Sequence, residues 1–337
     1  MLARSTTIRP PVGIPLQTPI LVPSFSSKGF KFKHDGISEV KDLFANTAEF
    51  LAETMLVSAY DIYYHHIPSP RRFPLVPALT FVDSGGYETN ADHDYSTVYH
   101  FHNKPKPWEL RHLRKILDSW PEHIPAVFVN FDKDSAGKRL PKQIALARAL
   151  FADYPKQMHL FLIKPSRQSK GSLLPIIDAL PACITELADF HILGVTEKEL
   201  GNTPLDRMTA IATLRRHLDA ANIHAPIQVF GALDPLSACL YFLAGAEIFD
   251  GLTWLRFSYT NGYSTYMQNH GILQIGLDQN DDFAHAKTFS DNYTFLMGLQ
   301  LKMRTFATTK DFCTLQYHYK FLRSASDALS ARLKGGV

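Results

Sequence analysis

The sequence has few cysteines, no long apolar run and little net charge, and each shortage excludes a class of protein. Three cysteines in 337 residues, Cys183, Cys239 and Cys313, lie too far apart for metal-ligand spacing or a disulfide framework. This usage is typical of a reducing compartment, so we expect a cytoplasmic protein. No apolar run reaches the ~20 residues of a membrane span, so we expect no membrane partner.

The formal net charge is only +3, which neither requires nor excludes a nucleic-acid partner. No glycine-rich phosphate loop follows the first apolar run, which gives no support to an open, doubly wound sheet. Residues 1–18 have basic residues but no apolar segment of a signal peptide, and we expect an irregular N-terminal arm. What is present, 45% hydrophobic residues, is enough for a large core.

Eight short apolar runs, which predict β-strands, recur along the chain. They occupy residues 19–25, 54–60, 78–84, 126–132, 159–165, 190–196, 227–233 and 246–252. Amphipathic segments with apolar residues at steps of three and four lie between them and predict helices. Apolar strands that alternate with helices indicate a parallel sheet covered on both faces. Eight such units predict an α/β fold, a closed (β/α)8 TIM barrel, with the open doubly wound sheet as the alternative.

Three further segments complete the predicted organisation. Residues 87–107 are too polar and too long for a plain connection, and we expect an insertion after the third strand that acts as a lid. Residues 260–287 read as irregular. Residues 301–337 carry seven Lys or Arg against two Asp and predict a basic helical tail that completes the barrel. The predicted domains are therefore the arm at 1–18, the barrel at 19–300 and the tail at 301–337.

Three carboxylates directly follow apolar runs. Asp83 ends the third predicted strand, Asp132 the fourth and Asp250 the eighth. Chemistry in TIM barrels is located at the carboxyl ends of the strands, so these groups are expected to meet at one end of the barrel. A carboxylate there is partly desolvated, which is costly without compensation. The alternative is that each Asp only caps the helix that follows it.

Several motifs in the right order resemble one enzyme family. The segment VDSGGYE (82–88) resembles the DSGG-aromatic signature of the guanine transglycosylases of queuosine and archaeosine synthesis, and AGAEIFDG (244–251) resembles their nucleophile segment. The FD of VNFDKDS (129–135) and the stretch FHILGVTEKE (190–199) match two further segments. The layout of residues 227–250 matches over its whole length, and the resemblance covers 19–262.

The resemblance implies a base exchange in nucleic acid, with the outgoing guanine replaced by a 7-deazaguanine-type base. Asp250 would be the nucleophile that attacks C1′ of the ribose and forms a covalent intermediate. Asp83 would be the general acid and base. Asp132 would accept hydrogen bonds from the N–H edge of the base.

Other matched positions would form the base pocket. The resemblance assigns base binding to Gly85, Gly86, Tyr87, Lys164, Gly194, Val195 and Phe230. Tyr87 and Phe230 would sandwich the ring, and Gly194 and Val195 would offer backbone groups. Ser84 and Arg256 would contact ribose or phosphate. The alternatives are that Tyr87 packs the lid, that Phe230 is a core residue and that Arg256 pairs with a surface carboxylate.

The sequence departs from the family at three places. The family's structural zinc site needs a cluster of cysteines after the nucleophile, but only Cys313 follows Asp250, so we expect no zinc and no other metal or cofactor. Lys164 stands in place of a glutamine, and an ammonium group only donates. Leu193 replaces a glycine before Gly194. All three aspartates remain, which favours an active pentosyltransferase.

The loss of the zinc region makes the chain resemble diverged members of the family, which modify DNA or accompany antiphage systems, more than the tRNA enzymes. The nucleic-acid partner, DNA or tRNA, stays open, and a homodimer is compatible with the sequence. Candidate phosphate contacts, each of which can equally be part of a solvated helix face, are Lys104, Lys106, Arg111, Arg114, Lys302, Arg304 and Lys310. The alternative functions are a deazaguanine-binding protein without exchange activity and an N-glycosidase or glycoside hydrolase.

Overall fold

The structure, a computed structural model, describes residues 2–90, 95, 104–169, 171–278 and 280–335. Eight parallel strands close into a barrel in the order β10-β3-β4-β5-β6-β7-β8-β9. These strands are β3 (Ile20–Phe25), β4 (Thr54–Ser58), β5 (Leu79–Asp83), β6 (Ala126–Val129), β7 (Met158–Leu162), β8 (Ile192–Thr196), β9 (Ile227–Phe230) and β10 (Ile248–Gly251). The predicted (β/α)8 fold is confirmed, and each predicted strand overlaps one observed strand.

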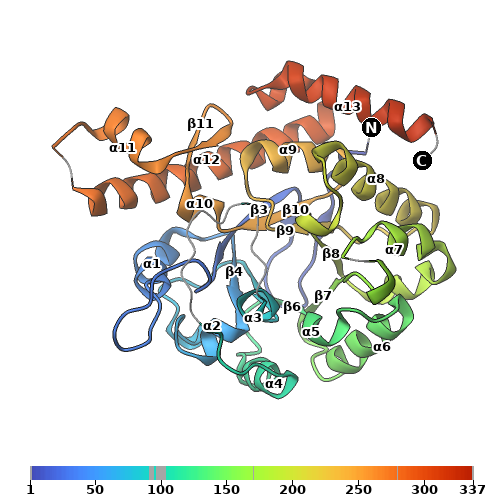
Figure 1. Cartoon of the computed structure of the whole chain (residues 1–337), viewed down its shortest axis with the longest axis horizontal. Helices are drawn as coiled ribbons and strands as arrows, with labels where there is room; N and C mark the ends of the chain where they lie inside the picture. Colours follow the sequence, from blue (N-terminus) through green and yellow to red (C-terminus); the bar gives the residue numbers. More distant parts are fainter. Residues whose placement is uncertain (1, 91–94, 96–103, 170, 279, 336–337) are drawn as a thin grey trace.

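Helices surround the barrel on the outside (Figure 1). They are α1 (Val40–Thr47), α2 (Ala59–Tyr63), α4 (Leu110–Ser119), α6 (Leu140–Phe151), α7 (Leu174–Ala179), α8 (Pro204–Ala220) and α9 (Pro235–Leu243). Shorter helices follow three strands directly: α3 (Gly86–Thr89), α5 (Asp132–Ser135) and α10 (Thr253–Arg256). Short 3-10 helices lie at Ala48–Phe50, Pro70–Arg72, Arg167–Ser169, Leu180–Ala182, Ile184–Asp189, Glu197–Glu199 and Phe312–Leu315.

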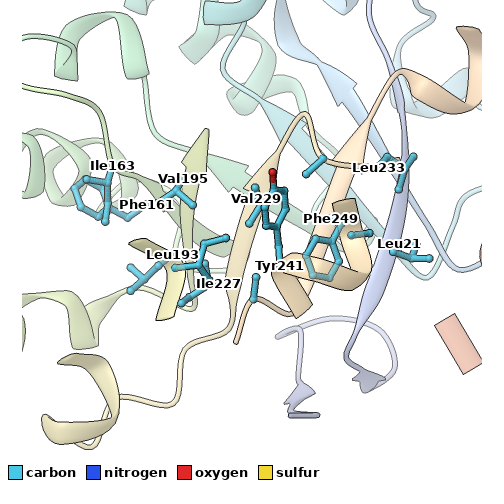
Figure 2. Close-up of a cluster of buried hydrophobic side chains, with 14 of the residues drawn as sticks. Leu21, Phe161, Ile163, Leu193, Val195, Ile227, Val229, Leu233, Tyr241 and Phe249 are labelled. Atoms are coloured by element: carbon cyan, nitrogen blue, oxygen red, sulfur yellow. The ribbon is translucent and has the colours of Figure 1, made fainter. Parts of the chain in front are cut away.

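Alternate residues of each strand face two different cores. In β3, Ile20 and Val22 pack inside the barrel, whereas Leu21 packs outward against the helices. Figure 2 shows part of the outer core, where strand side chains gather around Tyr241 of α9. Because both faces are covered, every residue of β3 is buried, which explains why the strands read as continuous apolar runs.

The amino end of the barrel is closed by the N-terminal arm. Residues of the arm form a hairpin of β1 (Thr7–Ile8) and β2 (Leu16–Gln17). Ile8 and Leu16 belong to the inner core cluster. The arm is therefore partly regular, and it leaves the carboxyl end of the barrel, which we call the mouth, as the end available for a site.

The region after β10 differs from the prediction. Residues 260–287 are not irregular, because they contain β12 (Tyr263–Thr265), α11 (Met267–Ile275) and the start of α12 (Asp281–Thr309). β11 (Ser258–Thr260) pairs with β12. Leu273 of α11 is 83% exposed, so this helix lacks the buried apolar stripe that sequence reasoning looks for.

α12 runs through the predicted boundary at residue 300 and is followed by α13 (Tyr319–Lys334). The first half of α12, with α11, projects away from the barrel (Figure 1). The predicted insertion at 87–107 begins with α3, but residues 91–94 and 96–103 lie outside the described residues, so its role as a lid stays a prediction.

Candidate functional site

One cavity of about 120 Å³ lies at the mouth. A single water needs about 10–15 Å³, so the space suits a larger group. Its lining includes Ser24, Phe25, Ser26, Leu56, Asp83, Gly86, Tyr87, Glu88, Asn90, Tyr95, Asp132, Leu162, Lys164, Thr196, Glu197, Lys198, Glu199, Phe230, Gly231, Asp250, Gly251 and Leu252. The three aspartates predicted to converge therefore line one cavity, together with Gly86, Tyr87, Lys164 and Phe230.

Asp250 lies near the end of β10 and is held by the two neighbouring strands. The Nε2 of Gln228 on β9 donates to its Oδ1 at 2.9 Å, and the hydroxyl of Ser24 on β3 donates to its Oδ2 at 3.2 Å. Both donors face into the barrel, as Asp250 does, because the side chains of neighbouring strands alternate in register. These contacts fix the orientation of a carboxylate that is only 4% exposed.

Asp83 ends β5, and the turn after it explains the glycine that follows. The backbone N–H of Gly85 donates to Asp83 Oδ2 at 3.0 Å. Gly85 has φ of 85°, and a side chain there would collide with Trp108. Burial raises the pKa of Asp83 well above its usual range, and the nearby carboxylates of Glu88 and Asp132 raise it further. Asp83 is therefore a better proton donor candidate than an exposed carboxyl group, because the raised pKa favours its protonated form.

Asp132 lies at the start of α5, three residues beyond the end of β6. The hydroxyl of Ser84 donates to its Oδ1 at 2.7 Å. An added Cβ at Gly86 would lie 2.1 Å from the same oxygen, so only glycine leaves room for this carboxylate. The DSGG segment thus builds the site through its backbone and its small residues.

The strand order sets which groups face one another across the mouth. β5 and β9 lie four strands apart in the ring of eight, and so do β6 and β10. Tyr87, which follows β5, and Phe230, which ends β9, therefore approach the cavity from opposite sides. Asp132 and Asp250 do the same.

Phe230 reaches the cavity because of the glycine on the next strand. An added Cβ at Gly194 would lie 2.8 Å from Phe230 Cε2 and 2.8 Å from Leu160 Cδ2. Gly194 and Val195 themselves do not line the cavity: the Gly194 carbonyl accepts from the N–H of Ile163 at 2.9 Å, and the side chain of Val195 packs in the outer core (Figure 2). The structure therefore does not place the backbone of these two residues at the cavity, where the expected contacts with the base would be made.

Lys164, the residue in place of a glutamine, is engaged by an acid. Its Nζ lies 2.6 Å from Glu199 Oε1 and 3.3 Å from Thr196 Oγ1. Both charged side chains are 13% exposed. Burial raises the pKa of Glu199, and the ammonium of Lys164 opposes this. The pair presents a donor and an acceptor to the cavity at once.

The cavity is rich in acidic groups. It has six carboxyl side chains and two ammonium groups, and these are Asp83, Glu88, Asp132, Glu197, Glu199 and Asp250 against Lys164 and Lys198. Carboxylates accept hydrogen bonds and cannot donate when ionised. The arrangement suits a ligand edge with several N–H donors.

Two predicted ribose or phosphate contacts have other partners. Ser84 is fully buried, lies outside the cavity lining and donates to Asp132, so the structure does not place its hydroxyl where the expected contact with ribose or phosphate needs it. Arg256 lies on α10 but is not among the residues that line the cavity, and its Nη2 donates to the carbonyl of Lys28 at 3.0 Å. Its guanidinium also lies 5.8 Å from the ring centre of Phe30.

Most candidate phosphate contacts are engaged within the fold. Arg114 pairs with Asp153 at 2.5 Å, and Arg304 pairs with Glu53 at 2.9 Å. The Nζ of Lys310 donates to the carbonyl of Ala3 at 2.6 Å. The other candidates contact neighbours of their own as well: Arg111 pairs with Glu109, and Lys106 and Lys302 lie over the rings of Tyr64 and Tyr317. Lys104 is exposed.

Sequence reasoning missed Gln228, Glu88 and Glu199. Gln228 is a single polar residue in the apolar run 226–230, at the alternation that faces the barrel, and this pattern is a usable signal. Glu88 closes the DSGGYE segment, and Glu199 follows the sixth barrel strand, β8, in the acidic TEKE segment. Their approach to the cavity depends on turns that the sequence does not specify.

Among the described residues, no group of three or more His, Cys, Asp or Glu is arranged to hold a metal ion. No helix in the described part of the chain has the length and hydropathy to cross a bilayer. No protein-family model matches the sequence, and no curated protein is significantly similar to it. The functional argument therefore depends on the cavity itself.

Proposed function

We propose that this chain is a base-exchanging transglycosylase that replaces guanine in nucleic acid by a 7-deazaguanine-type base. The observation that supports this most is that Asp83, Asp132 and Asp250, from three strand ends, line one small cavity with two aromatic rings on opposite sides. The resemblance to the guanine transglycosylases predicts that Asp250 is the nucleophile, that Asp83 is the general acid and base, and that Asp132 binds the base.

The proposed reaction has two displacement steps at C1′ of the ribose. In the first, a carboxylate oxygen of Asp250 attacks C1′, and the electrons of the C1′–N bond leave with guanine, which takes a proton from Asp83. In the second, the ionised Asp83 accepts a proton from the incoming base. The nitrogen of that base attacks C1′ and releases Asp250, so that Asp83 is again protonated.

The remaining groups hold the base. Asp132 accepts from the N–H edge, and the Ser84 hydroxyl keeps it in place. Tyr87 and Phe230 cover the two faces of the ring. The target nucleotide must leave any base stack to reach a cavity of this kind. Arg256, on the helix α10 that follows β10, is the group that the resemblance assigns to the phosphate or ribose of that nucleotide.

The experiment is incubation of the protein with radiolabelled guanine and either tRNA or duplex DNA. We expect label in one of the two polymers, which also identifies the partner. Release of base without incorporation would indicate an N-glycosidase, and binding without either would indicate a deazaguanine-binding protein; both results would overturn the proposal.

Asp250→Asn tests the nucleophile. This variant keeps the shape of the side chain but cannot form a glycosyl ester, so we expect no covalent complex with the polymer on denaturing gels. Binding of free guanine should persist, because the base-holding groups are unchanged. Full exchange by Asp250→Asn would remove this assignment.

A further inference from the structure

Glu88 is a buried carboxyl group of the cavity for which the proposed reaction has no use. It comes from α3, two residues after the glycine pair, and is 8% exposed. Its Oε2 accepts from the hydroxyl of Ser58 at 2.8 Å, and its Oε1 accepts from the hydroxyl of Ser26. A side chain held at both oxygens has one orientation and occupies no other rotamer without loss of a hydrogen bond.

The strand register places this carboxylate beside Asp83. Ser58, which donates to Glu88, is the direct partner of Asp83 across β4 and β5. Both carboxyl groups line the same cavity. Like charges this close cannot both be ionised without a large cost in a buried setting.

A third buried carboxyl group, that of Asp61, belongs with Glu88 and Asp83 but does not line the cavity. It lies on α2, is fully buried and accepts from the backbone N–H of Ser27 at 2.7 Å through Oδ2. Its Oδ1 is buried and has no hydrogen-bond partner among the described residues. An ionised carboxylate with a bare buried oxygen is costly, whereas a proton on it removes the charge. Glu88 therefore lies between two acids that favour the protonated form.

We propose that Glu88 is a positioning residue: its carboxylate, held by Ser26 and Ser58, keeps on Asp83 the proton that an acid needs. Two hydroxyl donors stabilise the charge on Glu88, whereas the described contacts give Asp83 only one backbone donor. The proton of the pair therefore resides on Asp83. This inference rests on the proposed function for its catalytic meaning.

The charged and titratable groups around Glu88 support this assignment. Burial raises the pKa of both Asp83 and Asp61, and for each the charge of Glu88 is the next largest cause. Lys28 and the two serine hydroxyls oppose the effect of burial on Glu88 itself. Tyr60, whose pKa is raised to about 12, stays neutral.

The first experiment needs no activity. Infrared titration of the ligand-free protein should show a protonated carboxyl group at neutral pH that is absent in Asp83→Asn. In Glu88→Gln the same band should titrate at a pH lower by about one unit or more, because a neutral neighbour no longer opposes ionisation. An unchanged titration in Glu88→Gln would overturn the proposal.

The second experiment measures guanine release as a function of pH. The alkaline limb, where Asp83 loses its proton, should move to lower pH in Glu88→Gln by the same amount. For a shift of about one unit, the variant at the wild-type midpoint should keep about a tenth of its own plateau rate, where the wild type keeps about half. Glu88→Ala should shift the limb in the same direction if the glutamine variant does not fold. Glu247→Gln, a carboxyl group buried at the other end of the barrel beside Thr18 and Arg215, is the control and should leave the midpoint unchanged.

The two experiments separate this inference from the proposed function. A shifted infrared titration without any base exchange keeps the role of Glu88 and rejects the transglycosylase. Base exchange with an unshifted alkaline limb keeps the transglycosylase and rejects the role of Glu88.

Discussion

Gly86 determines, at the scale of single residues, where Asp132 can lie. Its backbone is not in the left-handed region, so strain of the chain does not explain the glycine. The reason is the carboxylate of Asp132, whose two oxygens lie 2.1 and 2.2 Å from the place of a Cβ. Any side chain at Gly86 must displace Asp132 from the cavity.

We therefore expect Gly86→Ala to abolish measurable guanine binding in calorimetry. The cost in unfolding free energy should be about 1–3 kcal/mol, as for overpacking elsewhere. Gly298→Ala is the matched control, because an added Cβ on α12 meets nothing within 4 Å. That control should bind normally and gain up to about 1 kcal/mol from helix propensity. Normal binding by Gly86→Ala would mean that Asp132 does not hold the base.

At the scale of elements, the barrel strands are the most predictable part of the chain. Because they are buried on both faces, they appear in the sequence as apolar runs. The ends of these runs predict that Asp83 and Asp250 lie at the carboxyl ends of strands, where the structure has them. The prediction fails for residues 260–287. There α11 leaves Leu273 and Ile272 more than half exposed, so no apolar periodicity distinguishes it from a loop.

The site was predictable only where a side chain belongs to a strand end or its first turn. Asp250 and Phe230 are of this kind. The motif predicts a contact between Ser84 and the ligand, but the Ser84 hydroxyl donates to Asp132. A motif in the sequence does not give the direction of a side chain. The partners of Asp250, Ser24 and Gln228, come from strands more than 200 residues apart, and only closure of the barrel brings them together.

One side chain of α12, that of Asn292, makes three hydrogen bonds to the segment after β10. The Nδ2 of Asn292 donates to the carbonyls of Trp254 and Phe257, both at 2.7 Å, and its Oδ1 accepts from the N–H of Tyr259 at 2.8 Å. This asparagine binds three backbone groups of that segment at once. It therefore holds α10, and with it Arg256, against the barrel.

We expect Asn292→Ala to lower the free energy of unfolding by about 2–4 kcal/mol, because buried backbone groups lose their hydrogen bonds. Denaturant unfolding measures this directly. The neighbouring Asp291→Ala is the control, since Asp291 only pairs with Lys287 on the surface and should cost less than about 1 kcal/mol. Equal losses for the two variants would contradict the role given to Asn292.

At the scale of the whole molecule, stability must respond to pH through two opposed sets of buried groups. The carboxyl groups of Asp61, Asp83 and Glu88 have pKa values raised chiefly by burial. Their contribution is complete below the unfolded pKa of about 4 and is lost as the pH rises through their folded values. Burial lowers the pKa of His66 to about 4, so its contribution is present above about pH 6.5 and is lost as the pH falls.

Asp61→Asn tests one member of the first set, because the histidines are present in both the variant and the wild type and cancel in the difference. The amide cannot ionise, so the cost of a buried charge disappears while the size of the side chain is kept. We expect the variant and the wild type to be similar in unfolding free energy near pH 4, and the variant to become progressively more stable as the pH rises to 8. Denaturant unfolding at each pH gives the difference. A difference that stays constant from pH 4 to 8 would mean that Asp61 is ionised throughout, and that Glu88 has no protonated acid on its far side.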